Sequence, residues 1–367
     1  MPFDVRDFPD APPEERAAAR ANRRLVAGWL FGICAMILVM IGLGGATRLT
    51  GSGLSIMEWA PLRGALPPMS HAEWERLFGL YQQIPQYALL NDHMTLAGFK
   101  QIFWLEWVHR LWGRMIGLAF FVPLVWFWIS GRIERRLRPR LAVIFLLGGL
   151  QGAVGWFMVA SGFFPDSTRV APYRLVVHLV LALALYTAIL WTGLSVLRPL
   201  AQRDASSRLT RGLVRASCIL VGLTIVAGGF VAGTHAGFDY NTFPLMDGRL
   251  IPEGYARLRP VLLNLVENIA AVQFDHRLLA TATGVVTLAA VASGFLAPPR
   301  PALRRALLAL GSVVVVQYAL GVATLLAVVP VDLAVAHQMT AVLLLTAAVC
   351  TLHAAREAPP LPASSSP

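Results

Sequence analysis

Charge is scarce in this chain of 367 residues. Asp, Glu, Lys and Arg make up 14% of it, whereas hydrophobic residues make up 56%. A soluble globular protein carries about 25% charged residues, so the shortage argues against an ordinary soluble protein. Cysteine is also rare. The three cysteines (Cys34, Cys218 and Cys350) lie inside apolar stretches, where they resemble packing residues rather than a disulfide or metal framework.

Long hydrophobic runs, by contrast, are abundant. Eight of them reach about twenty residues, the length of a helix that crosses a bilayer. They fall at 25–46, 104–130, 141–161, 174–197, 212–233, 270–297, 303–328 and 331–354. The first run, at about 22 residues, is too long for the apolar region of a signal peptide, so we expect a retained helix. The predicted fold class is an all-α polytopic membrane protein with eight transmembrane helices.

The net charge of +11 does not indicate binding to nucleic acid, because the basic residues cluster between hydrophobic runs. Arginines gather in the N-terminal tail and at 132–140, 198–215 and 300–305. Cytoplasmic segments of membrane proteins carry an excess of Lys and Arg. This distribution predicts that both termini are cytoplasmic and that the long segments 47–103 and 234–268 lie outside.

The second half of the chain repeats landmarks of the first in the same order. Two glycine-rich segments, GGATRLTGSG and GGFVAGTHAG, begin at Gly44 and Gly228. Each is followed by a His-Arg pair, then a Gln-x3-Gly motif, then a further histidine. The repeat predicts two tandem four-helix bundles related by duplication. The expected boundaries are a tail at 1–24, bundles at 25–197 and 212–354, a linker at 198–211 and a tail at 355–367.

Four histidines recur at matching positions of this repeat. His109 and His178 belong to the second and fourth helices of the first half, and His276 and His337 to those of the second. We expect all four near the outer ends of their helices, at one depth. Two imidazoles on facing helices can supply the axial ligands of a haem iron. Packing histidines are the alternative, whereas zinc or copper would usually require thiolates or a third ligand.

The two halves differ three residues before the first histidine of each. Glu106 precedes His109, whereas Gln273 precedes His276. Residues at i and i+3 share a helix face, so a carboxylate is expected beside the first imidazole pair only. Ionisable residues in a membrane helix usually mark a functional site. The alternative is that Glu106 merely pairs with Arg110, four residues on. An amide at the duplicate position suggests that the fold also accepts one at 106.

The first outer segment, 47–103, is expected to be partly ordered. Residues 71–84 place Trp74, Leu77, Phe78 and Tyr81 on one face of a helix. We predict a short amphipathic helix near the outer membrane surface, covering the first histidine pair.

The motifs GGATRLTGSGLSIMEW, PLRGALPP, EWVHR, FDHR and VAHQ resemble the haem A synthases, the Cox15/CtaA family, in its alphaproteobacterial and mitochondrial-like branch. The resemblance covers 25–354. It implies an enzyme of the bacterial inner membrane that oxidises the C8 methyl group of haem O to a formyl group. The product, haem A, serves cytochrome c oxidase. The resemblance further implies contact with the farnesyltransferase that makes haem O, an electron-transfer partner and histidine sites toward the periplasm, and it leaves homo-oligomers open.

The resemblance also implies roles for individual residues. His276 and His337 would be axial ligands of a haem b iron, His109 and His178 would face the substrate haem, and Glu106 would be the catalytic carboxylate. Segment 47–103 departs from some bacterial members, because it contains no cysteine. A mechanism that uses a disulfide in this segment is therefore excluded.

Two other classes of protein remain open from the residues alone. A transmembrane dihaem cytochrome b would only move electrons and would not need Glu106. A transporter could use the histidines as a proton relay and would bind no pigment.

Overall fold

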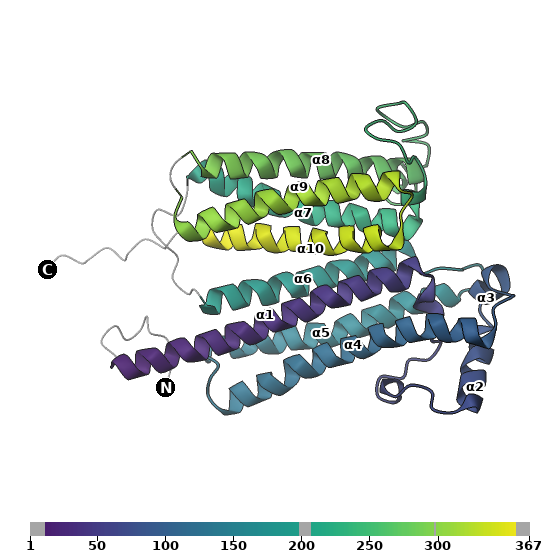
Figure 1. Cartoon of the computed structure of the whole chain (residues 1–367), viewed down its shortest axis with the longest axis horizontal. Helices are drawn as coiled ribbons and strands as arrows, with labels where there is room; N and C mark the ends of the chain where they lie inside the picture. The colour runs from purple at the N-terminus through teal and green to yellow at the C-terminus, as the bar shows by residue number, and fades with distance from the viewer. Residues whose placement is uncertain (1–11, 198–206, 297–298, 357–367) are drawn as a thin grey trace.

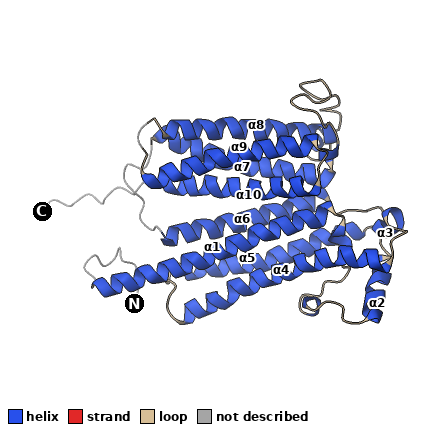
Figure 2. Ribbon diagram, in the orientation of Figure 1, coloured by secondary structure: helices blue, strands red, loops and turns tan. Residues whose placement is uncertain are grey.

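The computed structural model describes residues 12–197, 207–296 and 299–356. Within these ranges the chain is helical and contains no strand (Figure 2). Eight helices are long and apolar enough to cross a membrane, which confirms the predicted number of spans. They are α1 (Pro13–Leu49), α4 (Leu96–Ile129), α5 (Arg138–Ala160), α6 (Pro172–Leu197), α7 (Arg208–Thr234), α8 (Ile269–Gly294), α9 (Pro301–Leu326) and α10 (Val331–Ala354).

Two helices begin well before the apolar runs that predicted them. The first, α1, starts at Pro13, with Glu14 and Glu15 in its first turn, where negative charge favours a helix N-terminus. The expected tail at 1–24 is therefore helical from Pro13, and residues 1–11 lie outside the described ranges. Thr95 caps α4 by accepting a hydrogen bond from the Gly98 amide. Hydropathy detects only the lipid-facing length, so it missed both extensions.

The helices form two groups of four (Figure 1). In the first, α1 packs on α4 and α6, and α5 packs on α4 and α6, so the ring closes. In the second, α7 and α9 each pack on α8 and α10. The groups meet where α6 and α1 contact α7 and α10. Of the predicted linker and C-terminal tail, residues 198–206 and 357–367 lie outside the described ranges.

Glycines bring the two groups of helices into close contact. A Cβ on Gly45 of α1 would lie 2.7 Å from Oε1 of Gln338 on α10. A Cβ on Gly229 of α7 would lie 3.1 Å from Cδ2 of Leu179 on α6. Leu179 and Gln338 directly follow His178 and His337 in the sequence. In each contact, therefore, a glycine of one half packs against the residue that follows a histidine of the other half.

The first outer segment contains the predicted amphipathic helix. Helix α2 (His71–Tyr81) buries Trp74, Leu77 and Tyr81, and a short helix α3 (Pro85–Leu90) follows it. Ser70 caps α2 by accepting a hydrogen bond from the Glu73 amide at 3.2 Å. Figure 1 shows α2 running across the direction of α4, whose N-terminal end projects beyond the other spans. The buried rings of α2 pack against those of α4; for example, the ring centroids of Trp74 and Phe103 are 4.8 Å apart.

Candidate functional site

The four histidines form one pair in each group of helices. His109 on α4 and His178 on α6 lie on helices that face each other between α1 and α5. His276 on α8 and His337 on α10 are placed in the same way between α7 and α9. His178, His276 and His337 lie in the second or third turn of their helices, near the expected place. His109 lies in the fourth turn, because α4 begins eight residues before the apolar run. The structure thus brings together the residues that the repeat paired.

Each imidazole also lies against a glycine of the preceding long helix. An ideal Cβ on Gly155 or Gly321 would lie 2.9 Å from Cε1 of His178 or His337, and one on Gly228 would lie 3.0 Å from Cε1 of His276. A Cβ on Gly44 would lie 3.2 Å from Nε2 of His109. Real Cβ atoms rarely come this close to another side chain. A side chain at any of these glycines would therefore displace an imidazole.

Hydrogen bonds orient two of these rings. Nδ1 of His276 lies 3.1 Å from the carbonyl oxygen of Thr224 on α7. A carbonyl only accepts, so Nδ1 donates and Nε2 keeps a free lone pair for a ligand. The Gln151 amide of α5 lies 3.2 Å from Nδ1 of His178 and donates to the His178 carbonyl at 3.0 Å. The buried Oε1 atoms of Gln151 and its counterpart Gln317 have no hydrogen-bond partner among the described residues.

Glu106 is buried, with 3% of its surface exposed, and both carboxylate oxygens are engaged. Oε1 accepts from Nη2 and Nε of Arg110 at 2.6 and 3.0 Å. Oε2 accepts from the Ser55 hydroxyl at 2.7 Å and from the Ile56 amide at 2.9 Å. Arg110 in turn donates to the backbone carbonyls of Ile56 and Glu58. The pair thus joins α4 to the segment that follows α1.

Gln273 joins the equivalent elements in the second half. Its Nε2 donates to the backbone carbonyls of Ala236 and Asp239, and its Oε1 accepts from Nη2 of Arg277 at 2.8 Å. The two segments present opposite partners. The one at Glu106 offers donors, which suit a carboxylate, whereas the one at Gln273 offers acceptors, which suit an amide. The amide at 273 therefore does not show that an amide fits at 106.

Arg114 is a further anchor that the sequence pattern did not single out. It lies one turn after Arg110 on α4 and donates to the carbonyls of Ala60 and Pro61 at 2.8 Å each. Trp59 of the same segment stacks on Trp156 of α5, with ring centroids 6.1 Å apart. The sequence could have indicated this role, because Arg110 and Arg114 are four residues apart and share a helix face. Together these contacts tie segment 55–61 to α4 and α5.

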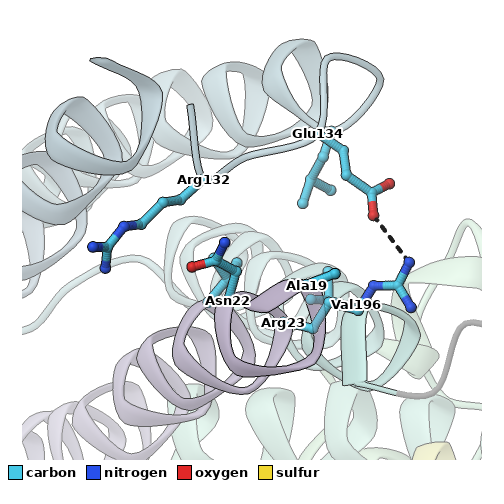
Figure 3. Close-up of a pocket in the computed structure, with 8 residues that line it drawn as sticks. Ala19, Asn22, Arg23, Arg132, Glu134 and Val196 are labelled. Carbon is cyan, nitrogen blue, oxygen red and sulfur yellow. Dashed lines mark ion pairs between the residues drawn. The ribbon is translucent and has the colours of Figure 1, made fainter. Parts of the chain in front are cut away.

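The cytoplasm-facing end predicted from the charges holds a pocket unrelated to the histidines. Figure 3 shows Asn22 and Arg23 of α1 beside it and an ion pair between Arg23 and Glu134. Nη2 of Arg23 lies 3.6 Å from Oε1 of Glu134. Gly44 lies 21 residues further along α1 than Arg23, or about 30 Å at 1.5 Å per residue. Across the described ranges, no three His, Cys, Asp or Glu side chains gather as a metal cluster would need. The candidate site is therefore the two imidazole pairs.

The fold and these pairs define a polytopic helical membrane protein with two candidate bis-histidine sites. The chain belongs to the COX15-CtaA family, described as cytochrome oxidase assembly protein, whose model matches residues 27–349. It is 64% identical to "Heme A synthase" of Granulibacter bethesdensis, over 92% of this chain and 89% of that protein. It is 50% identical to "Heme A synthase 2" of Acidiphilium cryptum, over 92% and 93%. The resemblance seen in the motifs is confirmed.

Proposed function

We propose that this protein is a haem A synthase that oxidises the C8 methyl group of haem O to a formyl group. The relatives named for this activity are similar over nearly the whole chain. The observation that carries the proposal is the placement of His109 and His178 on one pair of facing helices and of His276 and His337 on another, one pair in each group of helices. Two tetrapyrroles, one resident and one substrate, match two such pairs.

The residues fit haem better than they fit a small metal site. Each pair offers two imidazoles on facing helices with no third ligand among the described residues, as axial ligation of a haem iron requires. The glycine behind each ring keeps the space that a Cβ would fill. We assign His276 and His337 to haem b and His109 and His178 to the substrate haem. Conversion of the methyl to a formyl group is a four-electron oxidation that adds one oxygen atom from dioxygen or water, and haem b held here would pass electrons one at a time between this site and an electron-transfer partner.

The protein's own groups would hold and orient these haems. Thr224 fixes the tautomer of His276 by accepting from Nδ1, which leaves Nε2 for iron. Glu106 is clamped by Arg110, Ser55 and Ile56, so it cannot move far during the reaction. We therefore propose that it acts as a fixed negative charge that stabilises positive charge developing near the substrate methyl group. Segment 55–61, tied to α4 and α5, would exclude water from that site.

The proposal extends to partners and location. Haem O is lipid-soluble, so we propose direct transfer from the farnesyltransferase that makes it, within the bacterial inner membrane. An electron-transfer partner would reach the haem b half. The basic clusters support a cytoplasmic location for both termini and a periplasmic orientation for the histidines.

Extraction of porphyrins from cells that produce this protein together with a source of haem O tests the proposal. We expect haem A in the extract and a low-spin b-type spectrum in the purified protein. His276→Ala with His337→Ala should remove that spectrum. Two permanent low-spin haems without any haem A would identify an electron-transfer cytochrome instead, and absence of pigment would favour a transporter. Full haem b content in the double variant would contradict the ligand assignment.

A further inference from the structure

The glycines behind the four histidines form a pattern that the proposed activity does not by itself require. At Gly155, Gly228 and Gly321 the nearest ring atom is Cε1 and the second is Nδ1, at 3.4–3.5 Å. At Gly44 the nearest two atoms are Nε2 and Cδ2. These take the places of Cε1 and Nδ1 when an imidazole turns by 180° about its Cβ–Cγ bond. Three rings therefore present their Cε1–Nδ1 edge to a glycine, and the His109 ring would do so after such a turn.

No other glycine of these helices has an imidazole within 4 Å of an added Cβ, and several face open space. On α5, Gly148, Gly149 and Gly152 would have open space around a Cβ, and only Gly155 meets a side chain, that of His178. On α7, Gly212 and Gly222 also face open space, whereas Gly228 meets His276. Gly42 and Gly45 of α1 and Gly229 and Gly233 of α7 approach other residues of neighbouring helices as closely, so close contact is not confined to the histidines. Each of the four imidazoles nevertheless meets one glycine.

We propose that Gly44, Gly155, Gly228 and Gly321 are positioning residues that set where each imidazole sits relative to its haem iron. This inference rests on the proposed function, because it requires that the histidines bind haem. An imidazole that is not bound to iron can shift by a few tenths of an ångström to accommodate an added methyl group, and it keeps its hydrogen bond in doing so. An imidazole bound to iron cannot, because its nitrogen is tied to the metal. Alanine at these positions should therefore be tolerated without haem and harmful with it.

The resident haem half offers a matched pair of variants on one helix. Gly228→Ala places a methyl group 3.0 Å from the His276 ring, whereas Gly222→Ala places one in open space. Alanine favours helix more than glycine does, so neither change should weaken α7 itself. We expect Gly228→Ala to release haem b about 10- to 100-fold faster, as when other groups that orient a ligand are removed. The remaining haem should shift from a low-spin to a high-spin spectrum.

Gly321→Ala, which acts on His337, should reproduce the effect. Gly222→Ala should keep the haem content, release rate and spectrum of the unchanged protein. The helical content and thermal unfolding of the haem-free proteins should match across all four proteins. This comparison separates positioning from a general packing defect, which would lower stability without haem as well.

The outcomes distinguish this inference from the proposed function. Wild-type-like haem spectra and release rates in both Gly228→Ala and Gly321→Ala would overturn the positioning role alone, with the ligand assignment intact. Failure of Gly228→Ala to fold without haem would also overturn it, since a free ring should yield. If the double variant of His276 and His337 keeps its haem, the proposed function fails first.

Discussion

Arg48 donates a hydrogen bond of 3.0 Å from Nη1 to the carbonyl oxygen of Ala232, which lies 184 residues further along the chain. The same offset relates Gly44 to Gly228. Position 48 of the first half therefore contacts its own counterpart in the second half. Such a contact lies where the two groups of helices meet, close to any axis that relates them. Only the first half carries the guanidinium.

Arg48→Ala should loosen the contact between the halves. A hydrogen bond from a charged group contributes about 1.5–3 kcal/mol, and loss of this one leaves the Ala232 carbonyl without that donor. We expect a lower midpoint of thermal unfolding in detergent. Arg63→Ala, which removes an exposed arginine of the outer segment, is the control. Equal midpoints for the two variants would show that the contact adds no stability.

Glu106→Gln should stop haem A formation while the haem of His276 and His337 stays bound. The amide removes the fixed charge, so haem O or a hydroxylated intermediate should accumulate in porphyrin extracts. Ser55→Ala is the control, because it removes one donor to the carboxylate and keeps the charge. It should retain most haem A formation. Normal haem A levels in Glu106→Gln would leave Glu106 as a structural partner of Arg110.

Arg114→Ala should free segment 55–61 from α4. Loss of two hydrogen bonds to Ala60 and Pro61 lowers local stability. A loss of about 1.4 kcal/mol corresponds to roughly tenfold more of the open form. Trypsin should then cleave after the exposed Arg63 about tenfold faster in membranes. Lys100→Ala, which removes a cation from the same helix, should leave the rate unchanged. Equal rates would mean that Arg114 does not anchor the segment.

His235, which directly follows α7 in segment 234–268, should make stability fall in acid. Burial, and next the charges of Arg169 and Arg48, lower its pKa to about 4. An unfolded chain protonates histidine near pH 6.5. Between about pH 6.5 and 4 the unfolded state therefore binds the proton and the folded state does not, so stability decreases as the pH falls.

Comparison with His235→Asn isolates this effect. Asparagine tolerates the left-handed backbone at this position, where φ is 60°, and does not titrate. The unfolding midpoint of the unchanged protein should drop more between pH 7 and 5 than that of the variant. Parallel pH profiles would show that His235 does not contribute.

The parts of the fold that follow from local pattern could be predicted. Apolar runs located the eight spans, and the order of residues in the repeat was enough to pair His109 with His178 and His276 with His337. The four-residue spacing predicted the pair of Glu106 with Arg110. Its other two partners, Ser55 and Ile56, could not be predicted, because they lie about fifty residues away in a segment without periodicity. One of them acts through its backbone amide, which no residue type reveals. For the same reason, the sequence did not show that the segment at Glu106 offers hydrogen-bond donors whereas the segment at Gln273 offers acceptors.

The double glycines were visible in the sequence, but their separate roles were not. Gly44 faces an imidazole of its own half, whereas its neighbour Gly45 faces Gln338 of the other half. Successive residues on a helix point about 100° apart, so one pair serves two surfaces. Which surface each glycine meets depends on how the helices pack, and hydropathy does not carry that information.

The contacts of Gly45 with Gln338 and of Gly229 with Leu179 are reciprocal, as in an isologous interface. Each group of helices supplies one glycine and one side chain that packs against the glycine of the other group. Because both groups of helices belong to one polypeptide, their equivalent positions need not carry the same residue. One group can therefore carry a glutamate, Glu106, where the other carries a glutamine, Gln273.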